Sequence, residues 1–129
     1  MPKSHRLAAT PDTVHWGYFD AALSPVLRIA SGDRVVIETI SGNEKNQPVG
    51  MLGFDILPEY AAVYARHKQL HGPHIMTGPI YVEGAERGNT LEVRIIDIEL
   101  RQNWGYNVIR PLAGALPEDF GDTDRMIHI

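Results

Sequence analysis

The sequence has no cysteine, which excludes disulfide bonds and thiolate chemistry. It also lacks long apolar runs: none approaches the roughly 20 residues that span a bilayer, and residues 1–16 lack the apolar centre of a secretory signal. Basic residues form no block, and the net charge of -4 argues against nucleic acid or an anionic membrane as a partner. We therefore expect a cytoplasmic protein that binds neither.

Short motifs that identify many enzymes are missing as well. The sequence contains no His-Glu-x-x-His segment, no P-loop and no Gly-x-Ser-x-Gly elbow. Of the whole sequence, 43% of the residues are apolar and 22% are charged, a composition typical of a globular protein. The 129 residues are enough for a single domain with its own core. A functional site must therefore be sought among less regular groups of residues.

Two regions have the composition of β-strands. In the first, residues 26–29 lead through a Ser-Gly-Asp turn into residues 34–41 (RVVIETIS), which are rich in β-branched side chains. The second is residues 90–100 (TLEVRIIDIEL), where apolar and charged residues alternate as in a half-buried strand. The alternation changes phase at Ile96, which a bulge or a crossing between sheets would explain.

The two strand regions resemble each other. Residues 25–40 and 79–96 both run from a proline through a short strand and a glycine turn to a longer strand, and Trp-Gly-Tyr occurs at 16–18 and 104–106. Paired hairpins of this kind predict a β-sandwich or barrel. The alternative is that similar turns simply recur in β proteins.

One helix is predicted over residues 58–70, which begin with a proline and end before Gly72-Pro73. Residues 41–57 are rich in glycine and asparagine and predict a loop. The apolar residues of the helix form only a modest face: Ala61, Ala62, Ala65 and Leu70.

Two groups of polar residues are candidates for chemistry. His71 and His74 are separated by Gly-Pro, which directs the two rings apart and disfavours joint chelation of a metal. In the segment HWGYFDA, Asp20 could orient the ring of His15 or complete a ligand set. The preferred alternative is that the aromatic residues anchor a strand while Asp20 caps a turn. The acidic pair at 118–119 is interpreted as a solvated turn.

Three long sequence segments occur in the order found in one known family: HWGYFDAALSPVLRIASGDRVVIETISG, GPHIMTGPIYVEGAERGNTLEVRIIDI and NWGYNVIRPLAGALPEDF. Over residues 14–120 the chain resembles the N-terminal part of the acetamidase/formamidase family. The resemblance implies a mainly β fold, with a jelly-roll-like β-sandwich portion and one short helix. It also implies hydrolysis of small linear amides, such as formamide and acetamide, to a carboxylate and ammonia. A divalent metal, usually zinc, is implied for some members.

The chain departs from the family pattern in two places. The turn at residues 84–89 has Arg87 and Asn89 where the family usually has Pro and Asp. Family members are also more than twice as long, and their later part carries Gly-Asp-x-His and Gly-Asp-Gly-Glu segments that would supply metal ligands and a base. The resemblance thus implies that residues 1–129 are one domain, corresponding to the N-terminal part of such an enzyme. A complementary C-terminal polypeptide or a homo-oligomer would complete it.

By this resemblance His74 is the first candidate for catalysis and for metal binding, and Asp20 is a second catalytic candidate. Thr77 and the backbone N–H of Gly78 are expected to hold the substrate carbonyl, with His15 as a further substrate-binding residue. The alternative is a non-catalytic β-sandwich module or an inactive truncated homologue. Such a module would assemble through uncovered apolar surface, or through the predicted strand at residues 125–129.

Overall fold

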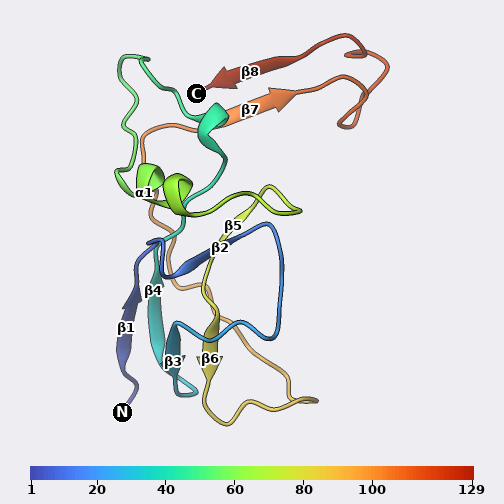
Figure 1. Ribbon diagram of the computed structural model, residues 1–129. Helices are drawn as coiled ribbons and strands as arrows, with labels where there is room; N and C mark the ends of the chain where they lie inside the picture. Colours follow the sequence, from blue (N-terminus) through green and yellow to red (C-terminus); the bar gives the residue numbers. More distant parts are fainter. The chain divides into compact units, whose positions relative to one another are not determined.

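The strands pair as four two-stranded ladders, as a computed structural model of residues 1–129 shows (Figure 1). The prediction of a mainly β protein with one short helix is confirmed. None of its helices is long and apolar enough to cross a membrane. In chain order the elements are β1 (Ser4–Leu7), β2 (Val14–Trp16), β3 (Leu27–Ile29), β4 (Arg34–Ile37), the 3-10 helix η1 (Glu44–Asn46), α1 (Glu59–Arg66), β5 (Ile75–Thr77), β6 (Ile80–Val82), β7 (Tyr106–Ile109) and β8 (Arg125–His128).

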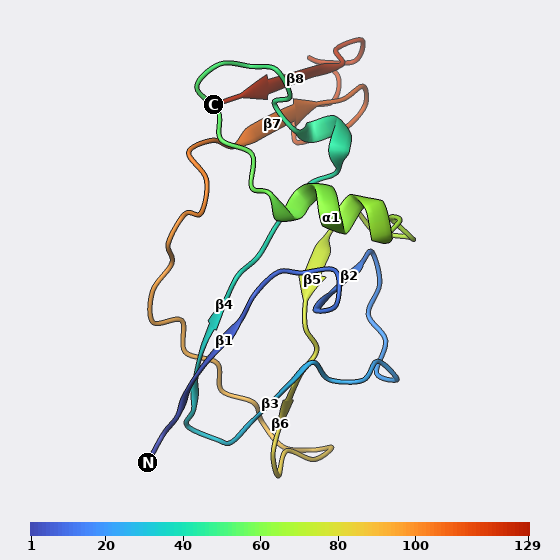
Figure 2. The same cartoon turned by 60° about the vertical axis from the view of Figure 1, so that its left-hand side comes forward.

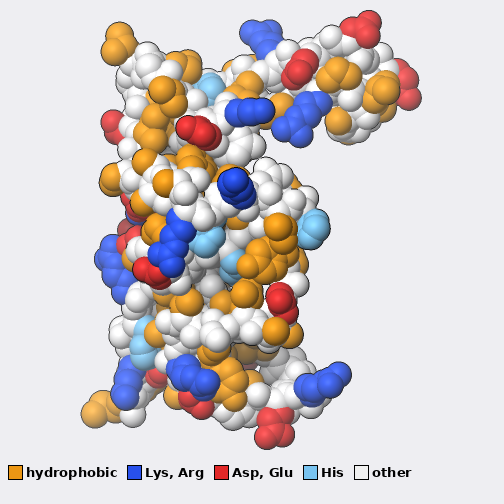
Figure 3. Space-filling model, viewed as in Figure 1, with side chains coloured by type: hydrophobic (Ala, Val, Ile, Leu, Met, Phe, Trp, Pro, Cys, Tyr) orange, Lys and Arg blue, Asp and Glu red, His pale blue; other side chains and the backbone are white.

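The residues group into two compact units. Unit 1 comprises Met1–Glu44 and Pro58–Ile98, and unit 2 comprises Lys45–Leu57 and Glu99–Ile129. Unit 1 holds β1 to β6 and α1, whereas unit 2 holds β7, β8 and most of η1. On the face in Figure 3, Lys and Arg side chains are interspersed with Asp and Glu and gather into no single patch. The single domain expected over residues 1–129 stays a prediction.

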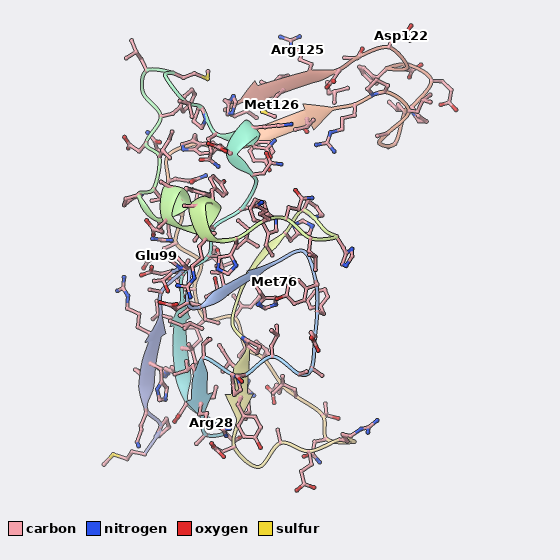
Figure 4. The ribbon with its side chains drawn as sticks, in the orientation of Figure 1. Arg28, Met76, Glu99, Asp122, Arg125 and Met126 are labelled. Carbon is pink, nitrogen blue, oxygen red and sulfur yellow. The ribbon has the colours of Figure 1, made fainter.

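The first strands of the two similar sequence regions pair with each other. β3 and β6 are parallel, with Arg28 opposite Tyr81, and the Arg28 guanidinium lies 4.3 Å from the centre of the Tyr81 ring. Figure 4 labels Arg28 beside these strands. Backbone hydrogen bonds from Val26 N to Pro79 O and from Glu83 N to Ile29 O extend the ladder. The similarity of the two regions is therefore matched by direct pairing of their short strands.

The hairpin predicted within residues 25–40 is wrong, because β4 pairs in parallel with β1 and not with β3. The side chain of Asp33 explains this outcome. Its carboxylate accepts hydrogen bonds from the backbone N–H of Ala30 in the turn and of Lys3 before β1, at 3.1 and 2.8 Å. The turn is thereby fixed to β1, which brings β4 alongside β1.

The Asp33 cluster makes stability depend on pH in the acid range. The backbone N–H of Lys3, the ring of His5 at 2.8 Å and the N–H of Ala30 all stabilise the carboxylate, which lowers the pKa of Asp33 from 3.8 to about 2. Because this pKa is lower in the folded than in the unfolded chain, its contribution to stability is complete above pH 3.8 and is lost as the pH falls toward about 2.

We expect Asp33→Asn to reduce stability near neutral pH, and the difference from wild type to shrink as the pH falls toward about 2. Urea denaturation at a series of pH values measures this difference. Asp119→Asn, which removes an exposed carboxylate of unit 2, controls for the loss of one charge. If the difference in stability between the two proteins did not change with pH, the low pKa of Asp33 would not be the source of the pH dependence.

The long strand predicted over residues 90–100 is wrong: these residues form no strand, and all of them are exposed. Figure 2 draws them without a strand arrow. Alternating apolar residues favour an extended backbone, but a strand also needs a neighbour for its N–H and C=O groups. No backbone hydrogen bond within the protein joins residues 90–97 to another segment.

The predicted helix is present but shorter, since α1 ends at Arg66 and the backbone of His67 is extended. Its buried side chains are Tyr60 and Val63, and the predicted alanine face is wrong because Ala61, Ala62 and Ala65 are exposed. The aromatic ring and the β-branched side chain have more apolar surface to bury than alanine. The predicted loop at 41–57 contains the short η1 helix.

Each Trp-Gly-Tyr segment anchors a ladder in the same way. Trp16 and Trp104 are both buried, and their indole N–H groups donate to the carbonyls of Pro73 and Asp55 at 3.2 and 2.7 Å. In unit 2 the glycine after Trp104 exchanges two backbone hydrogen bonds with Ile129, at the end of the antiparallel β7–β8 ladder. The predicted strand at the C-terminus is therefore present as β8 and pairs with β7 of the same chain.

Candidate functional site

A pocket of about 540 Å³ lies in unit 1 beside the β2–β5 ladder. One wall comes from β2 and β5, and the other from the segment that follows β2. Figure 4 labels Met76, which belongs to the first wall. The lining residues are His15, Phe19, Asp20, Ala21, Leu23, Met76, Thr77, Gly78 and Pro79.

The alternation of β2 directs His15 to the pocket. Val14 and Trp16 are buried, whereas His15 between them is only partly buried and lies opposite Met76 of β5. Beyond the strands, Gly17 N donates to His74 O at 2.9 Å and Gly78 N to Thr13 O at 2.8 Å. The paired backbone thus fixes the position of this wall.

His15 is the histidine of the pocket, and its two ring nitrogens differ. Its ring lies against Tyr18, with centroids 5.3 Å apart, and Nδ1 is buried without a hydrogen-bond partner. A buried polar atom without a partner is uncommon and costs free energy. Nε2 is not buried in this way, so it is the nitrogen that a bound molecule can reach.

Asp20 lines the same pocket and also caps a turn. Its Oδ1 accepts a hydrogen bond from Ala22 N at 2.8 Å, which leaves Oδ2 available to the pocket. No hydrogen bond joins Asp20 to His15. The turn-capping interpretation of Asp20 is confirmed, and the carboxylate does not orient the imidazole directly.

The hydrogen bonds of Thr77 and Gly78 do not support their expected role as donors to a substrate carbonyl. The Thr77 hydroxyl donates to Glu38 O at 2.8 Å, and the Gly78 N–H is used by Thr13 O. Both donors are occupied by carbonyls from distant parts of the chain. Thr77 Oγ1 can still accept a hydrogen bond, because a hydroxyl oxygen has two lone pairs.

Three histidine rings are held by hydrogen bonds to Asp33, to Pro11 O and to Asn46 O: those of His5, His67 and His128. The remaining three are His15, His71 and His74. The side chains of His71 and His74 are exposed and do not line the pocket. The structure thus gathers four of the five predicted site residues, and His74 lies outside the pocket.

Sequence reasoning missed the apolar part of the pocket. Met76, Leu23 and Phe19 line it, and Phe19 is 92% exposed. No local pattern marks these residues as a group. Met76 becomes recognisable only once β5 is known to pair with β2, because the register then places it opposite His15.

The described residues do not fit a divalent metal site. No group of three or more His, Asp or Glu side chains lies close enough to hold an ion, and the pocket contains only His15 and Asp20 of these types. A catalytic zinc site needs about three protein ligands and an open position. The expected metal therefore enters none of the chemistry derived from this chain.

The structure defines a mainly β protein with a partly apolar pocket that holds one imidazole and one carboxylate. Comparison of its sequence with models of protein families gives a match to the Acetamidase/Formamidase family over residues 4–127. Because the match spans nearly the whole chain, the protein belongs to this family. Searches of curated proteins and of solved structures gave no significant match. Membership in the family suggests hydrolysis of small amides.

Proposed function

We propose that the pocket beside β2 and β5 binds a small linear amide of the formamide or acetamide type, and that the protein hydrolyses it to a carboxylate and ammonia. Family membership supports the type of reaction. We choose this site because His15, Asp20 and Thr77 line the same pocket, together with apolar side chains.

The pocket complements the two ends of such an amide. Thr77 Oγ1, whose own hydrogen is directed to Glu38 O, accepts a hydrogen bond from the amide N–H, and Asp20 Oδ2 accepts the second one. The acyl group packs against Leu23 and Met76. The substrate's nitrogen therefore lies between two acceptors.

In the proposed reaction, His15 Nε2 serves first as a base and then as an acid. It takes a proton from the attacking water, so that the water oxygen forms the new bond to the carbonyl carbon. It then returns the proton to the departing nitrogen as the C–N bond breaks. The reaction consumes one amide and one water, and it releases a carboxylic acid and ammonia, which ionise in solution.

The two donors expected to stabilise the negative charge that develops on the carbonyl oxygen are already occupied. The Gly78 N–H and the Thr77 hydroxyl both serve other acceptors, and such stabilisation is commonly the largest part of catalysis. We propose that residues from a second copy or a complementary polypeptide complete the site. Zinc belongs to the proposal only with ligands from outside this chain. A cytoplasmic location is likewise proposed.

The assay is ammonia release from formamide and acetamide by the purified chain, with and without zinc and with and without the polypeptide encoded beside it. We expect release in at least one of these conditions. N,N-dimethylacetamide is the matched control, because it has no N–H for Thr77 and Asp20 and should not be turned over. Absence of ammonia in every condition would contradict the proposal.

A second candidate function is that of a non-catalytic assembly module. The observation that favours it is the exposed apolar stretch in residues 90–100, since such surfaces commonly mark sites of association.

A further inference from the structure

Residues 90–96 have the properties of a strand without a neighbour. Leu91, Val93 and Ile95 alternate along the segment and are 66, 75 and 77% exposed. Their backbone N–H and C=O groups form no hydrogen bond with another part of the chain. An extended backbone with free polar groups and apolar side chains on one face is a template for pairing with another strand.

The charges within the segment indicate what that other strand is. Glu92 and Arg94 alternate with the apolar residues, so in an extended strand they lie on the opposite face. Arg94 Nε is 2.5 Å from Glu92 Oε1. When two copies of the segment run antiparallel with Val93 opposite Val93, Glu92 of each copy lies opposite Arg94 of the other. The same register places Leu91 opposite Ile95.

Neighbouring registers lack this complementarity. If the segment shifts so that Glu92 faces Glu92, two carboxylates lie opposite each other; if Arg94 faces Arg94, two guanidinium groups do. Like charges directly opposite on paired strands are destabilising, whereas opposite charges and aliphatic pairs stabilise. The sequence of these residues is thus self-complementary in one antiparallel register, which is the symmetry required for a two-fold dimer.

We propose that residues 90–96 form an intermolecular antiparallel ladder with the same residues of a second copy of this protein, centred on Val93. The ladder supplies partners for the backbone groups and gathers six aliphatic side chains, three from each copy, on one face. It also forms two Glu92–Arg94 pairs between the copies. The proposal is independent of amide hydrolysis, because none of these residues lines the pocket.

Cysteine cross-linking tests the register, and the absence of native cysteine makes the test unambiguous. Opposite Cα atoms of an antiparallel pair lie about 4.5–5.5 Å apart, within the range that a disulfide requires. We therefore expect Val93→Cys to give a disulfide-linked dimer on mild oxidation. Leu91→Cys is the matched control, because its two copies would lie about 14 Å apart along the strands and should not cross-link. Equal cross-linking of both variants, or none of Val93→Cys, would overturn the proposal.

Charge reversal tests the pairing without a cross-link. Sedimentation should show a dimer for the wild type and at least about tenfold weaker dimers for Glu92→Arg and for Arg94→Glu. The double variant exchanges the two charges and should restore the dimer. Circular dichroism checks that the variants fold, which is expected because both side chains are exposed. A monomeric wild type would overturn the proposal, and so would single variants that dimerise as well as the wild type. A double variant that stays weak would overturn it too.

Discussion

Replacing Gly17 by alanine is expected to destabilise unit 1 by about 2–4 kcal/mol. The Gly17 backbone has φ +86°, and a Cβ atom there would lie 2.5 Å from Gly72 O and 2.8 Å from Gly72 N. These are backbone atoms, and the hydrogen bond from Gly72 N to Gly17 O at 2.8 Å prevents the two segments from moving apart freely. The substitution therefore strains the contact that holds residues 71–74 against the end of β2.

Gly32→Ala provides the matched control. Gly32 also has φ +86°, but a Cβ atom there would meet nothing within 4 Å. Its replacement should cost only the conformational penalty of about 1 kcal/mol. The difference between the two variants in urea denaturation isolates the close approach of Gly17 and Gly72. Equal losses of stability would show that this contact is not restrictive.

Removing the imidazole of the pocket should have the largest effect on activity. In a preparation that releases ammonia, we expect His15→Ala to lower kcat/KM by about 10²–10⁴, the usual contribution of a general acid–base residue. His71→Ala and His74→Ala are controls of the same type, because their exposed side chains do not line the pocket. Both should remain close to the wild type.

The activities of the His15 and His74 variants also show where the catalytic site lies. If His74→Ala abolishes turnover while His15→Ala retains it, the catalytic site does not lie in the β2–β5 pocket, and the original sequence-based choice of His74 is favoured. Thermal denaturation of each variant separates loss of chemistry from loss of folding.

Local sequence patterns predicted several elements, since composition and end signals are local. The strand at β3 and the helix beginning after Pro58 follow from such patterns. Strand pairing is different, because β3 finds its partner in β6, more than 50 residues later. Alternation indicates which face of a strand is apolar, but it does not identify the neighbour. Residues 90–100 fail as a predicted strand for that reason.

The sequence predicted four of the residues that line the pocket, but it did not predict all of the hydrogen bonds that they form. The family resemblance and the sequence segments that carry it pointed to His15, Asp20 and Thr77, and the structure brings these residues to one pocket. That the Thr77 hydroxyl is occupied could not be foreseen, since its acceptor is the carbonyl of Glu38. That His74 is exposed and does not line the pocket likewise depends on the folded structure, and its predicted role stays a prediction.

The central claim is that the pocket beside β2 and β5 binds the amide, and titration with acetamide followed by NMR tests it without requiring turnover. The account predicts saturable shifts of the His15 ring and Met76 methyl signals, with no change at His74 or at Met126, which belongs to unit 2. Unchanged His15 and Met76 signals at saturating acetamide, or shifts at His74 instead, would contradict it.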